Sequence, residues 1–356
     1  MCTSMLNLSV VRGPLEEHRN KEILREFNRL TNSHVPIKDY CRWVENSPEG
    51  PAWHALLTTE NSRIAGHICL IPLRAEYEGK RLVVARTEYF FVHEDFRSEK
   101  VHGLENSFLS PAILLLDQLY RHCWEKGWGP FLVSAAKEIQ PFHELVGCRA
   151  VDFPLHECLF LTRPWKAAKQ TPNLNGVKRL ALWAVGLVQG MAWQAARVAL
   201  TLRSEAVSSR GVDEAPDAKN ACGIVLFADQ ESLAWRYPAG SYVLLNDEKE
   251  PRSYAIAKMS SGGDYLRVCQ WQLESVRSAG KLVRSLLLQA QSGGTAGVRW
   301  AVFADDDMAA NLVHSLRKLG FLCAARVRRL LVYSEDPAFF DASKWRLSDS
   351  LFNFDL

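Results

Sequence analysis

The sequence has very little net charge for its length. Its 43 lysine and arginine residues and 40 acidic residues leave a net charge of +3 over 356 residues. Proteins that bind DNA usually carry a larger positive charge on one surface, so we expect no DNA partner. The first ten residues, MCTSMLNLSV, also lack the basic start and the long apolar core of a signal peptide. We therefore expect a cytoplasmic protein.

The sequence also lacks the cysteine patterns of metal sites. Its nine cysteines are scattered, and the closest two, Cys148 and Cys158, do not have the CxxC spacing of a zinc site. Scattered free cysteines behave as small buried hydrophobes and are typical of a reducing compartment. The acidic run at 305–307 falls at an expected helix start, where aspartates cap the first turn. We therefore expect free cysteines and no bound metal.

Several common enzyme motifs are missing as well. The sequence contains no Walker, dinucleotide-binding or nucleophile-elbow pattern. Its composition, with 47% hydrophobic and 23% charged residues, is nevertheless that of a soluble globular protein. A chain of 356 residues is long enough for two domains with sizeable cores.

The first half of the sequence predicts a regular series of strands and helices. Its central stretch, 86–131, reads as an aromatic strand, a polar loop and an apolar helix that begins at Pro111. A helix that follows a strand in this way directs its free N–H groups outward, as in many pyrophosphate sites. In order we expect a strand at 6–12, a helix at 14–30, strands at 53–59, 64–75 and 81–92, a helix at 111–124, a strand at 130–135, a short helix at 141–145 and a strand at 155–162.

The second half repeats this order. The segment 234–240 resembles the segment 42–50, because in each a tryptophan is followed by a proline and a glycine. A fixed order of similar elements is the signature of an internal repeat. In the second half we expect strands at 242–245, 254–259 and 265–273, a helix at 281–291, a strand at 300–304, a helix at 308–319 and a strand at 328–333.

The predicted fold class is α/β, and more narrowly α+β with mixed sheets. We expect two tandem domains, each a mixed, mostly antiparallel sheet flanked by helices, with a substrate cleft at their junction. The expected domains are residues 1–164 and 221–356, joined by an amphipathic helix and a mobile linker at 165–220.

The segment 177–203 predicts the helix of this connection. It has no charged residue between Arg179 and Arg197, a gap at the lower edge of the length that spans a membrane. Its basic and amide side chains fall on one half of the helix, and its large apolar side chains fall on the other. This pattern argues against a membrane-spanning helix. Two alternatives remain: the helix is buried between the halves, or it makes peripheral contact with a membrane surface.

Four short motifs accompany this order of elements. They are Arg42-Trp43 with Pro48 and Gly50, Gly66-His67 with Pro72, His93-Glu-Asp-Phe-Arg97, and Asp341-Ala-Ser-Lys-Trp345-Arg-Leu-Ser-Asp349. The order of elements resembles that of the GNAT family of acyl-CoA-dependent N-acyltransferases, and because it occurs twice the chain resembles a tandem GNAT protein. The motifs are similar to those of GNAT proteins from bacterial polysaccharide gene clusters. The tandem arrangement is more distantly similar to that of Fem-type aminoacyl transferases.

The resemblance implies a donor site at the loop after the strand 81–92. The family loop has Arg or Gln, two residues, Gly, one residue, and Gly or Ala. Arg97 keeps the first position but both small residues are missing, whereas the second half keeps Arg277 and Gly280 and has Leu282 at the last position. Side chains at the small positions obstruct the approach of backbone to phosphate. The residues that the resemblance assigns to the phosphates of acyl-CoA are Arg97, Lys100, His102, Gly103, Asn106 and Ser107.

The resemblance also implies the position of a catalytic acid. In the family, a tyrosine four residues before the glycine of the closing Gly-Phe protonates the departing thiolate. That position is His143 in the first half and Leu316 in the second half. Histidine is able to act as an acid near neutral pH and leucine is not, so we expect the first half to be the catalytic one.

A carboxylate on the central strand commonly acts as the base in this reaction, directly or through water. Glu88 is the first candidate and His93 is the second. Alternatively, Glu88 is a structural residue that faces solvent or pairs with an arginine such as Arg74 or Arg86.

The predicted function is transfer of an acyl group from acyl-CoA to an amine of a small metabolite or amino sugar, in polysaccharide or envelope biosynthesis. One alternative is a Fem-type transfer from aminoacyl-tRNA, which the small net charge disfavours. The other is a non-catalytic binding or assembly protein, which the altered phosphate loops favour.

Overall fold

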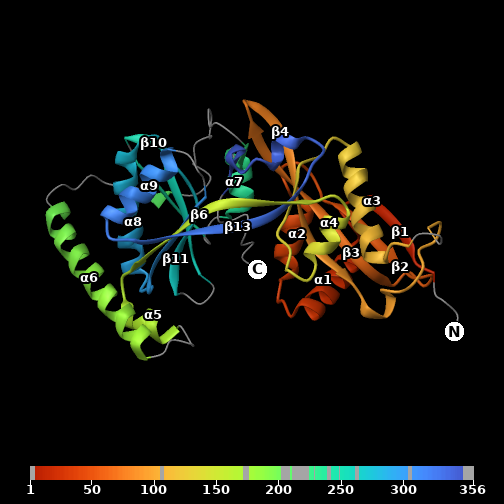
Figure 1. The fold of residues 1–356 in the computed structure, drawn as a ribbon, viewed down its shortest axis with the longest axis horizontal. Helices are drawn as coiled ribbons and strands as arrows, with labels where there is room; N and C mark the ends of the chain where they lie inside the picture. The colour runs from red at the N-terminus through yellow and green to blue at the C-terminus, as the bar shows by residue number, and fades with distance from the viewer. Residues whose placement is uncertain are drawn as a thin grey trace.

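The strands of both halves belong to one sheet. The structure is a computed structural model that describes residues 5–104, 108–170, 176–201, 209–210, 224–227, 229–238, 242–247, 249–260, 264–303 and 307–347. Within these residues the sheet has the order β1-β2-β3-β4-β5-β13-β6-β12-β11-β10-β9-β7, and two short strands, β8 (Ile224–Leu226) and β14 (Trp345–Arg346), lie off this path (Figure 1).

Each half supplies an outer set of strands. The first half supplies β1 (Asn7–Arg12), β2 (Trp53–Thr58), β3 (Ile64–Tyr77), β4 (Lys80–Val92) and β5 (Phe131–Val133). The second half supplies β9 (Val243–Asp247), β10 (Glu250–Met259), β11 (Tyr265–Gln272) and β12 (Gly297–Phe303). Their neighbours are antiparallel except for the parallel pairs β4–β5 and β11–β12. The prediction of a mixed, mostly antiparallel sheet in each half is confirmed.

The last strand of each half lies in the sheet of the other half. β6 (Arg149–Leu161) pairs with β12, and β13 (Leu322–Tyr333) pairs with β5. β6 and β13 also pair with each other, antiparallel, and run side by side from one half to the other (Figure 1). Neither half can complete its own sheet without a strand from the other half.

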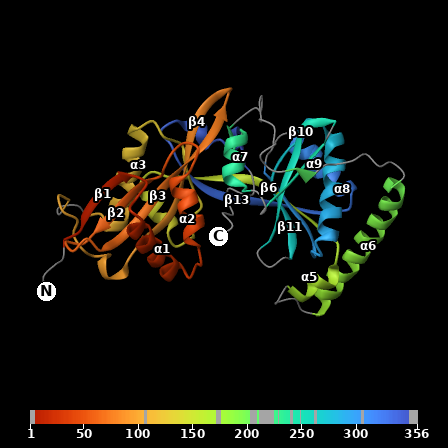
Figure 2. The ribbon, with the colours of Figure 1, turned by 180° about the vertical axis from the view of Figure 1, so that it is seen from behind.

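Helices cover both faces of this sheet. One face carries α1 (Glu17–Thr31), α2 (Ile37–Glu45) and α7 (Gln230–Arg236), over one hydrophobic core that spans the two halves (Figure 2). The other face carries α3 (Pro111–Glu125) and α4 (Gln140–Leu145) over the first half, and α8 (Val276–Ser292) and α9 (Asp307–Lys318) over the second half. Among the described residues α1 has no counterpart before α7.

Most predicted elements are present within a few residues of their expected bounds. α3 begins at Pro111 and buries an apolar stripe that includes Leu115 and Leu119, as its periodicity predicts. α2 was not predicted, and β6 and β13 each begin six residues earlier than expected, at 149 and 322. The additional residues belong to the β6–β13 pair between the halves, where exposed residues such as Arg326 and Arg328 hide the alternation of a strand. The predicted linker at 208–220 lies outside the described residues except for β7 (Ser209–Arg210).

A disulfide bond joins the two exchanged strands. Cys158 on β6 and Cys323 on β13 stand opposite each other in the register, although they are 165 residues apart in the sequence. The other five cysteines within the described residues are free. The expectation of free cysteines is therefore wrong for this pair.

Two helices follow β6 on the outside of the second half. α5 (Pro164–Gln170) and α6 (Gly176–Thr201) lie at the end of the molecule far from the first half (Figures 1 and 2). α6 exposes several large apolar side chains, so the expectation that it is buried between the halves is wrong. Among the described residues no helix is long and apolar enough to cross a membrane.

The strand exchange predicts that the two halves fold only together. Residues 1–164 expressed alone would lack β13 beside β5, and the inner edges of β5 and β6 would be exposed to aggregation. We expect this fragment to be insoluble or to unfold without cooperativity, and we expect co-expression of 1–205 with 221–356 to give a soluble heterodimer by size-exclusion chromatography. A monomeric 1–164 fragment with a cooperative thermal transition would contradict the exchange.

Candidate active site

Each half contains one place where two parallel strands diverge. β4 pairs with β5 as far as Arg86 and then separates from it, although β4 continues to Val92. β11 pairs with β12 as far as Val268 and continues to Gln272. Beyond these points the edge of β4 or β11 has no hydrogen-bonding partner in the neighbouring parallel strand. Backbone groups at such an edge are available to a ligand.

A β-bulge follows each point of divergence. In β4 the register with β3 shifts at Tyr89, whose φ is +54°, so that Glu88 and Tyr89 both face the helices α1, α2 and α7. In β11 the register shifts at Cys269, and Cys269 and Gln270 both face α7. Bulges of this kind re-aim side chains at functional sites. The two bulges also show which residues of the two halves are equivalent: Cys269 of β11 corresponds to Glu88 of β4.

Glu88 lies between arginines from the two halves. It forms an ion pair with Arg86, and both side chains are largely buried, so the alternative that Glu88 pairs with Arg86 is confirmed. Arg236 of α7 is 1% exposed and stacks on the ring of Trp43 at 4.6 Å. Burial raises the pKa of Glu88, against the opposing influence of Arg86 and then Arg236. The other arginine considered, Arg74, pairs instead with Glu231 at 2.8 Å.

His143 lies at the end of a buried hydrogen-bond chain. Its Nδ1 is 2.9 Å from the hydroxyl of Tyr120 on α3, and that hydroxyl is 2.8 Å from Oγ1 of Thr87 on β4. Burial lowers the pKa of His143 to about 4, so the imidazole is uncharged at neutral pH. The sequence does not mark Tyr120 as a site residue, because its helical spacing places it in an apolar stripe. Its hydroxyl lies within hydrogen-bond distance of His143.

His93 and Arg97 lie in the turn after β4. His93 caps the short 3₁₀ helix η1 (Glu94–Phe96), and its Nδ1 accepts from the backbone N–H of Asp95 at 3.4 Å. Arg97 is exposed, and its Nε donates to the carbonyl oxygen of Val92 at 3.4 Å. Both residues therefore remain close to the end of β4.

Lys100, His102 and Gly103 lie farther away. The backbone of this loop is tied to the start of the chain, because Leu6 N–H donates to Lys100 at 2.9 Å and His102 N–H donates to Leu6 at 2.7 Å. Leu6 precedes the edge strand β1, three strands from β4, which is roughly 14 Å at ordinary strand spacing. The structure thus does not bring Lys100 and His102 to the divergence of β4 and β5. Asn106 and Ser107 lie outside the described residues.

The N-termini of α3 and α8 differ in the side chains that bind there. Eighteen residues separate β4 from α3, but only three separate β11 from α8. At α8, Ser275 donates a hydrogen bond to the carboxylate of Glu250, and the Ser278 hydroxyl lies within hydrogen-bond distance of both Glu250 and Asp247, 2.8 Å from the latter. At α3, the buried Oγ of the capping residue Ser110 has no partner among the described residues. The chain's own carboxylates therefore fill one helix start, and the other is able to accept an anion.

Aromatic side chains line the divergence in the described part of the second half. Trp271 of β11 and Trp300 of β12 pack edge to face at 6.4 Å on the side of α8 and α9. Leu316 occupies the position of His143, since its carbonyl oxygen accepts from Phe321 as that of His143 accepts from Cys148. With Cys269 in place of Glu88, the second half has neither of the predicted acid–base residues.

Comparisons with solved structures agree with this architecture. A probable N-acyltransferase from Enterococcus faecalis aligns with a TM-score of 0.56 at 10% identity, over 91% of this chain and 72% of its own. A GCN5-related N-acetyltransferase from Kribbella flavida aligns with a TM-score of 0.53 at 15% identity, over 92% and 71%. A tandem GNAT protein from the clavulanic acid biosynthesis pathway aligns with a TM-score of 0.50 at 13% identity, over 91% and 98%.

The chain has the fold of a tandem GNAT protein. The structural resemblance covers the first GNAT half, the second GNAT half and the exchanged strands, because it extends over nine tenths of the chain. No family model matches the sequence, and a search of curated proteins finds no significant match. The similarity thus lies in the arrangement of the elements.

One group within the described residues of the first GNAT half could hold a metal ion. The ligand atoms of His54, His67 and Cys69 lie within 4.8 Å of one another and are buried. His54 Nδ1 and His67 Nε2 are already 3.0 Å apart in a hydrogen bond, and the other nitrogen of His67 contacts the carbonyl of Tyr89 at 3.0 Å. The contact of His67 with the Tyr89 carbonyl holds the bulge of β4 in place from the neighbouring strand β3.

The buried histidines predict that the protein loses stability in mild acid. Burial lowers the pKa of both His67 and His143 from 6.5 to about 4, so the unfolded chain binds more protons between these values. The stabilisation is present above pH 6.5 and is lost as the pH falls toward 4, by about 3 kcal/mol per histidine.

Urea unfolding at several pH values measures this effect. His143→Gln should remove about 3 kcal/mol of the decrease between pH 7 and pH 4. His18→Gln is the matched control, because His18 is exposed. An equal decrease in both variants would contradict the assignment.

Proposed function

We propose that this protein is an acyl-CoA-dependent N-acyltransferase, with its active site in the first GNAT half. The acceptor would be an amine of a small metabolite or an amino sugar, as in polysaccharide or envelope biosynthesis. The observation that carries the proposal is the position of Glu88, on the bulge just past the divergence of β4 and β5. The equivalent residue of the second GNAT half, Cys269, is a poor substitute for this carboxylate.

Glu88 would act as the general base. The attacking amine must lose a proton, and the Glu88 carboxylate would accept it directly or through one water. Burial raises the pKa of Glu88, which strengthens it as a base, and the neighbouring Arg86 and Arg236 oppose this shift. The acceptor would approach from the side of α2 and α7, where Trp43 and Trp235 meet at 5.0 Å.

The open edge of β4 would polarise the reacting carbonyl. N–H groups beyond Arg86 that face β5 have no partner in that strand. Such fixed donors stabilise the negative charge that develops on a thioester oxygen when the amine attacks. The amine nitrogen then forms the amide bond, and the carbon–sulfur bond breaks.

The departing thiolate requires a proton, and the chain of Thr87, Tyr120 and His143 would supply it. Thr87 is the member on β4, and its hydroxyl bonds to that of Tyr120 at 2.8 Å. Burial raises the pKa of Tyr120 well above its ordinary value, so Tyr120 would give its proton to Thr87 only as the Thr87 hydroxyl protonates the thiolate. An N–H of the neutral His143 imidazole would stabilise the phenolate that forms, and a proton from solvent would then restore Tyr120. In this proposal His143 supports the acid, and Tyr120 provides the proton.

The start of α3 would hold the phosphates of the donor. Pro111 has no N–H, and the N–H groups of Ile113 and Leu114 donate to the carbonyl oxygen of Ser110. The Ala112 N–H, the Oγ of Ser110, which has no partner among the described residues, and Arg97 at the end of β4 would therefore bind an anionic group of this kind. The start of α8 does not fit, because Glu250 and Asp247 already occupy it. We therefore expect one donor molecule per chain.

Replacement of Glu88 tests the base. Glu88→Gln should lower kcat by about 100-fold or more, because general base catalysis contributes roughly that factor. Its KM for acyl-CoA should change little, since Glu88 faces away from α3. Cys269→Ala at the equivalent position is the matched control and should leave kcat within about twofold of the unchanged protein. Steady-state kinetics with a panel of amines and amino sugars measure both, and equal activities would exclude Glu88 as the base.

Replacement of Ser110 tests the donor site. Ser110→Asp keeps a good helix cap but places a negative charge where the phosphates would bind, so acyl-CoA affinity should fall about tenfold or more. Ser275→Ala at the start of α8 is the control and should not change it. Isothermal titration calorimetry distinguishes the outcomes: loss of binding in the control alone would assign the donor to the second GNAT half.

A further inference from the structure

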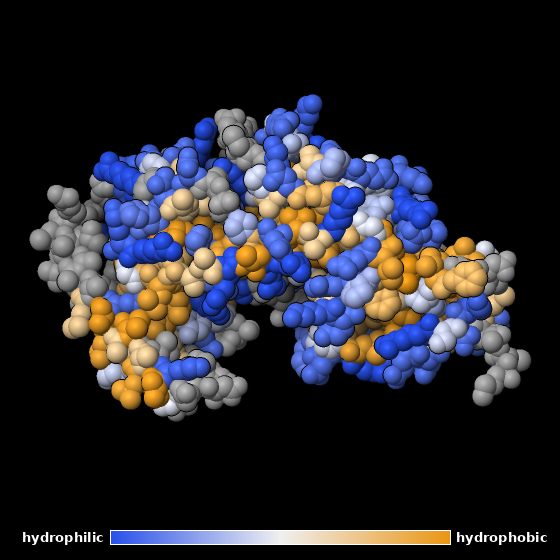
Figure 3. Space-filling view, viewed as in Figure 1, coloured by the Kyte–Doolittle hydropathy of each residue, from blue (hydrophilic) through white to orange (hydrophobic). Residues whose placement is uncertain are grey.

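The α6 helix turns its apolar stripe toward solvent. Leu180 is 72% exposed and Met191 is 65% exposed. These residues recur at helical spacing, and the side chains that share the stripe are Val177, Leu180, Leu187, Val188 and Met191, with Trp183 beside it. Trp165 of α5 is 53% exposed on the same outer part of the molecule. Figure 3 shows apolar side chains gathered at this end, next to the grey residues.

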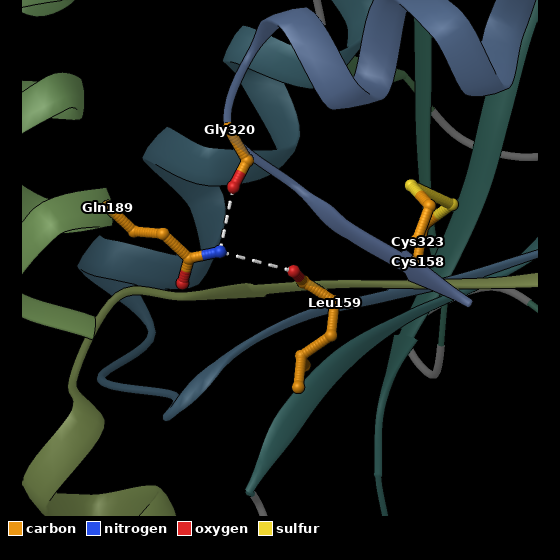
Figure 4. The surroundings of a disulfide bond; sticks show 5 residues. All are labelled: Cys158, Leu159, Gln189, Gly320 and Cys323. Carbon is orange, nitrogen blue, oxygen red and sulfur yellow. Dashed lines mark hydrogen bonds between the residues drawn. A yellow bond between two sulfur atoms is a disulfide. The ribbon is translucent and has the colours of Figure 1, made fainter. Parts of the chain in front are cut away.

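The opposite side of α6 attaches it to the protein. Gln189 lies at the end of the β6–β13 pair, where its Oε1 accepts from Leu161 N–H at 3.0 Å. Its Nε2 donates to the carbonyl oxygens of Gly320 at 2.7 Å and Leu159 at 3.4 Å (Figure 4). Gly186 packs against Pro164 of α5 with no space for a side chain. The helix is therefore held by a small, polar side. An outward apolar stripe on a helix fixed in this way indicates a surface that something else covers.

The segment that contains α5 and α6 is also unusually basic. Residues 164–203 contain six basic residues and no acidic residue. The remaining 37 basic and 40 acidic residues leave the rest of the chain at −3, so this segment accounts for the whole positive balance. Lys178 and Arg179 lie in the first turn of α6, where the helix dipole disfavours cations. Their position does not stabilise the helix.

We propose that the surface formed by α5 and α6 docks on an anionic lipid bilayer. An apolar stripe with tryptophan beside it, in a segment whose charged residues are all basic, is the combination that lies in the interfacial plane of a membrane. The basic residues complement anionic headgroups, and the stripe enters the acyl boundary. A second copy of the chain is a poor occupant, because residues 164–203 contain no acidic residue that could pair with the basic residues of a symmetric partner. This inference does not depend on the acyltransferase reaction.

Co-sedimentation with vesicles tests the proposal. The full-length protein should bind vesicles of mixed phosphatidylcholine and phosphatidylglycerol at least tenfold more tightly than pure phosphatidylcholine vesicles. High salt should weaken the binding. The triple variant Leu180→Gln, Leu187→Gln, Met191→Gln should lose at least tenfold of it.

A matched control replaces three exposed apolar residues of other elements. The variant Leu145→Gln, Leu288→Gln, Val327→Gln removes similar apolar surface outside α6 and should keep its vesicle binding. If the α6 triple variant fails to fold by circular dichroism, the charge variant Lys178→Glu, Arg179→Glu replaces it and should also lose binding. No binding by the unchanged protein, equal binding to both vesicle types, or a dimer in solution that the α6 triple variant dissociates would overturn the proposal.

Discussion

The pairing of β6 with β13 is the interaction on which the rest of the structure depends. Each strand leaves its own half and completes the sheet of the other, so the two halves share every inner edge. The disulfide bond between Cys158 and Cys323 adds a covalent link at the same pair. One hydrophobic core then continues beneath α1, α2 and α7 across both halves. The relative position of the halves is therefore fixed by strand hydrogen bonds together with this shared core.

This fixed arrangement lets the second half contribute to a site in the first. Arg236 belongs to α7, yet it lies near Glu88 and stacks on Trp43 of α2. Trp235 of the same helix donates its indole N–H to the carbonyl oxygen of Arg42 at 3.0 Å. The second half therefore helps to set the environment of the proposed base. Among the described residues of the second half, the helix start, the bulge and the divergent strands hold Glu250, Cys269 and a tryptophan pair.

Much of the fold could be predicted from the sequence because it is local. The periodicities of α1 and α3, the long strands before α3 and the repeated order of elements all depend on neighbouring residues. The strand exchange does not depend on neighbouring residues, since β6 and β13 pair with strands that are far away in the sequence. The middle of β13 is also exposed to solvent between the halves. Exposed arginines such as Arg326 and Arg328 therefore conceal a strand that hydrogen bonds, and not burial, hold in place.

The candidate site was predictable to a similar extent. A carboxylate on a β-rich, aromatic strand directed attention to Glu88, and the closing glycine directed attention to His143. Tyr120 was not found, because a tyrosine at helical spacing reads as core until its hydroxyl partner is known. Lys100 and His102 were chosen from their position in the loop, and only the pairing of that loop with Leu6 shows that it leads toward the far edge of the sheet.

The central proposal is that the protein has a single acyl-CoA site, located in the first half. Hydrogen–deuterium exchange with and without acyl-CoA measures it directly, because bound phosphates and a filled strand divergence protect local amides. We expect protection at residues 87–92 and at the start of α3, with no change at residues 269–280. Protection confined to residues 269–280, or protection at both places, would contradict it.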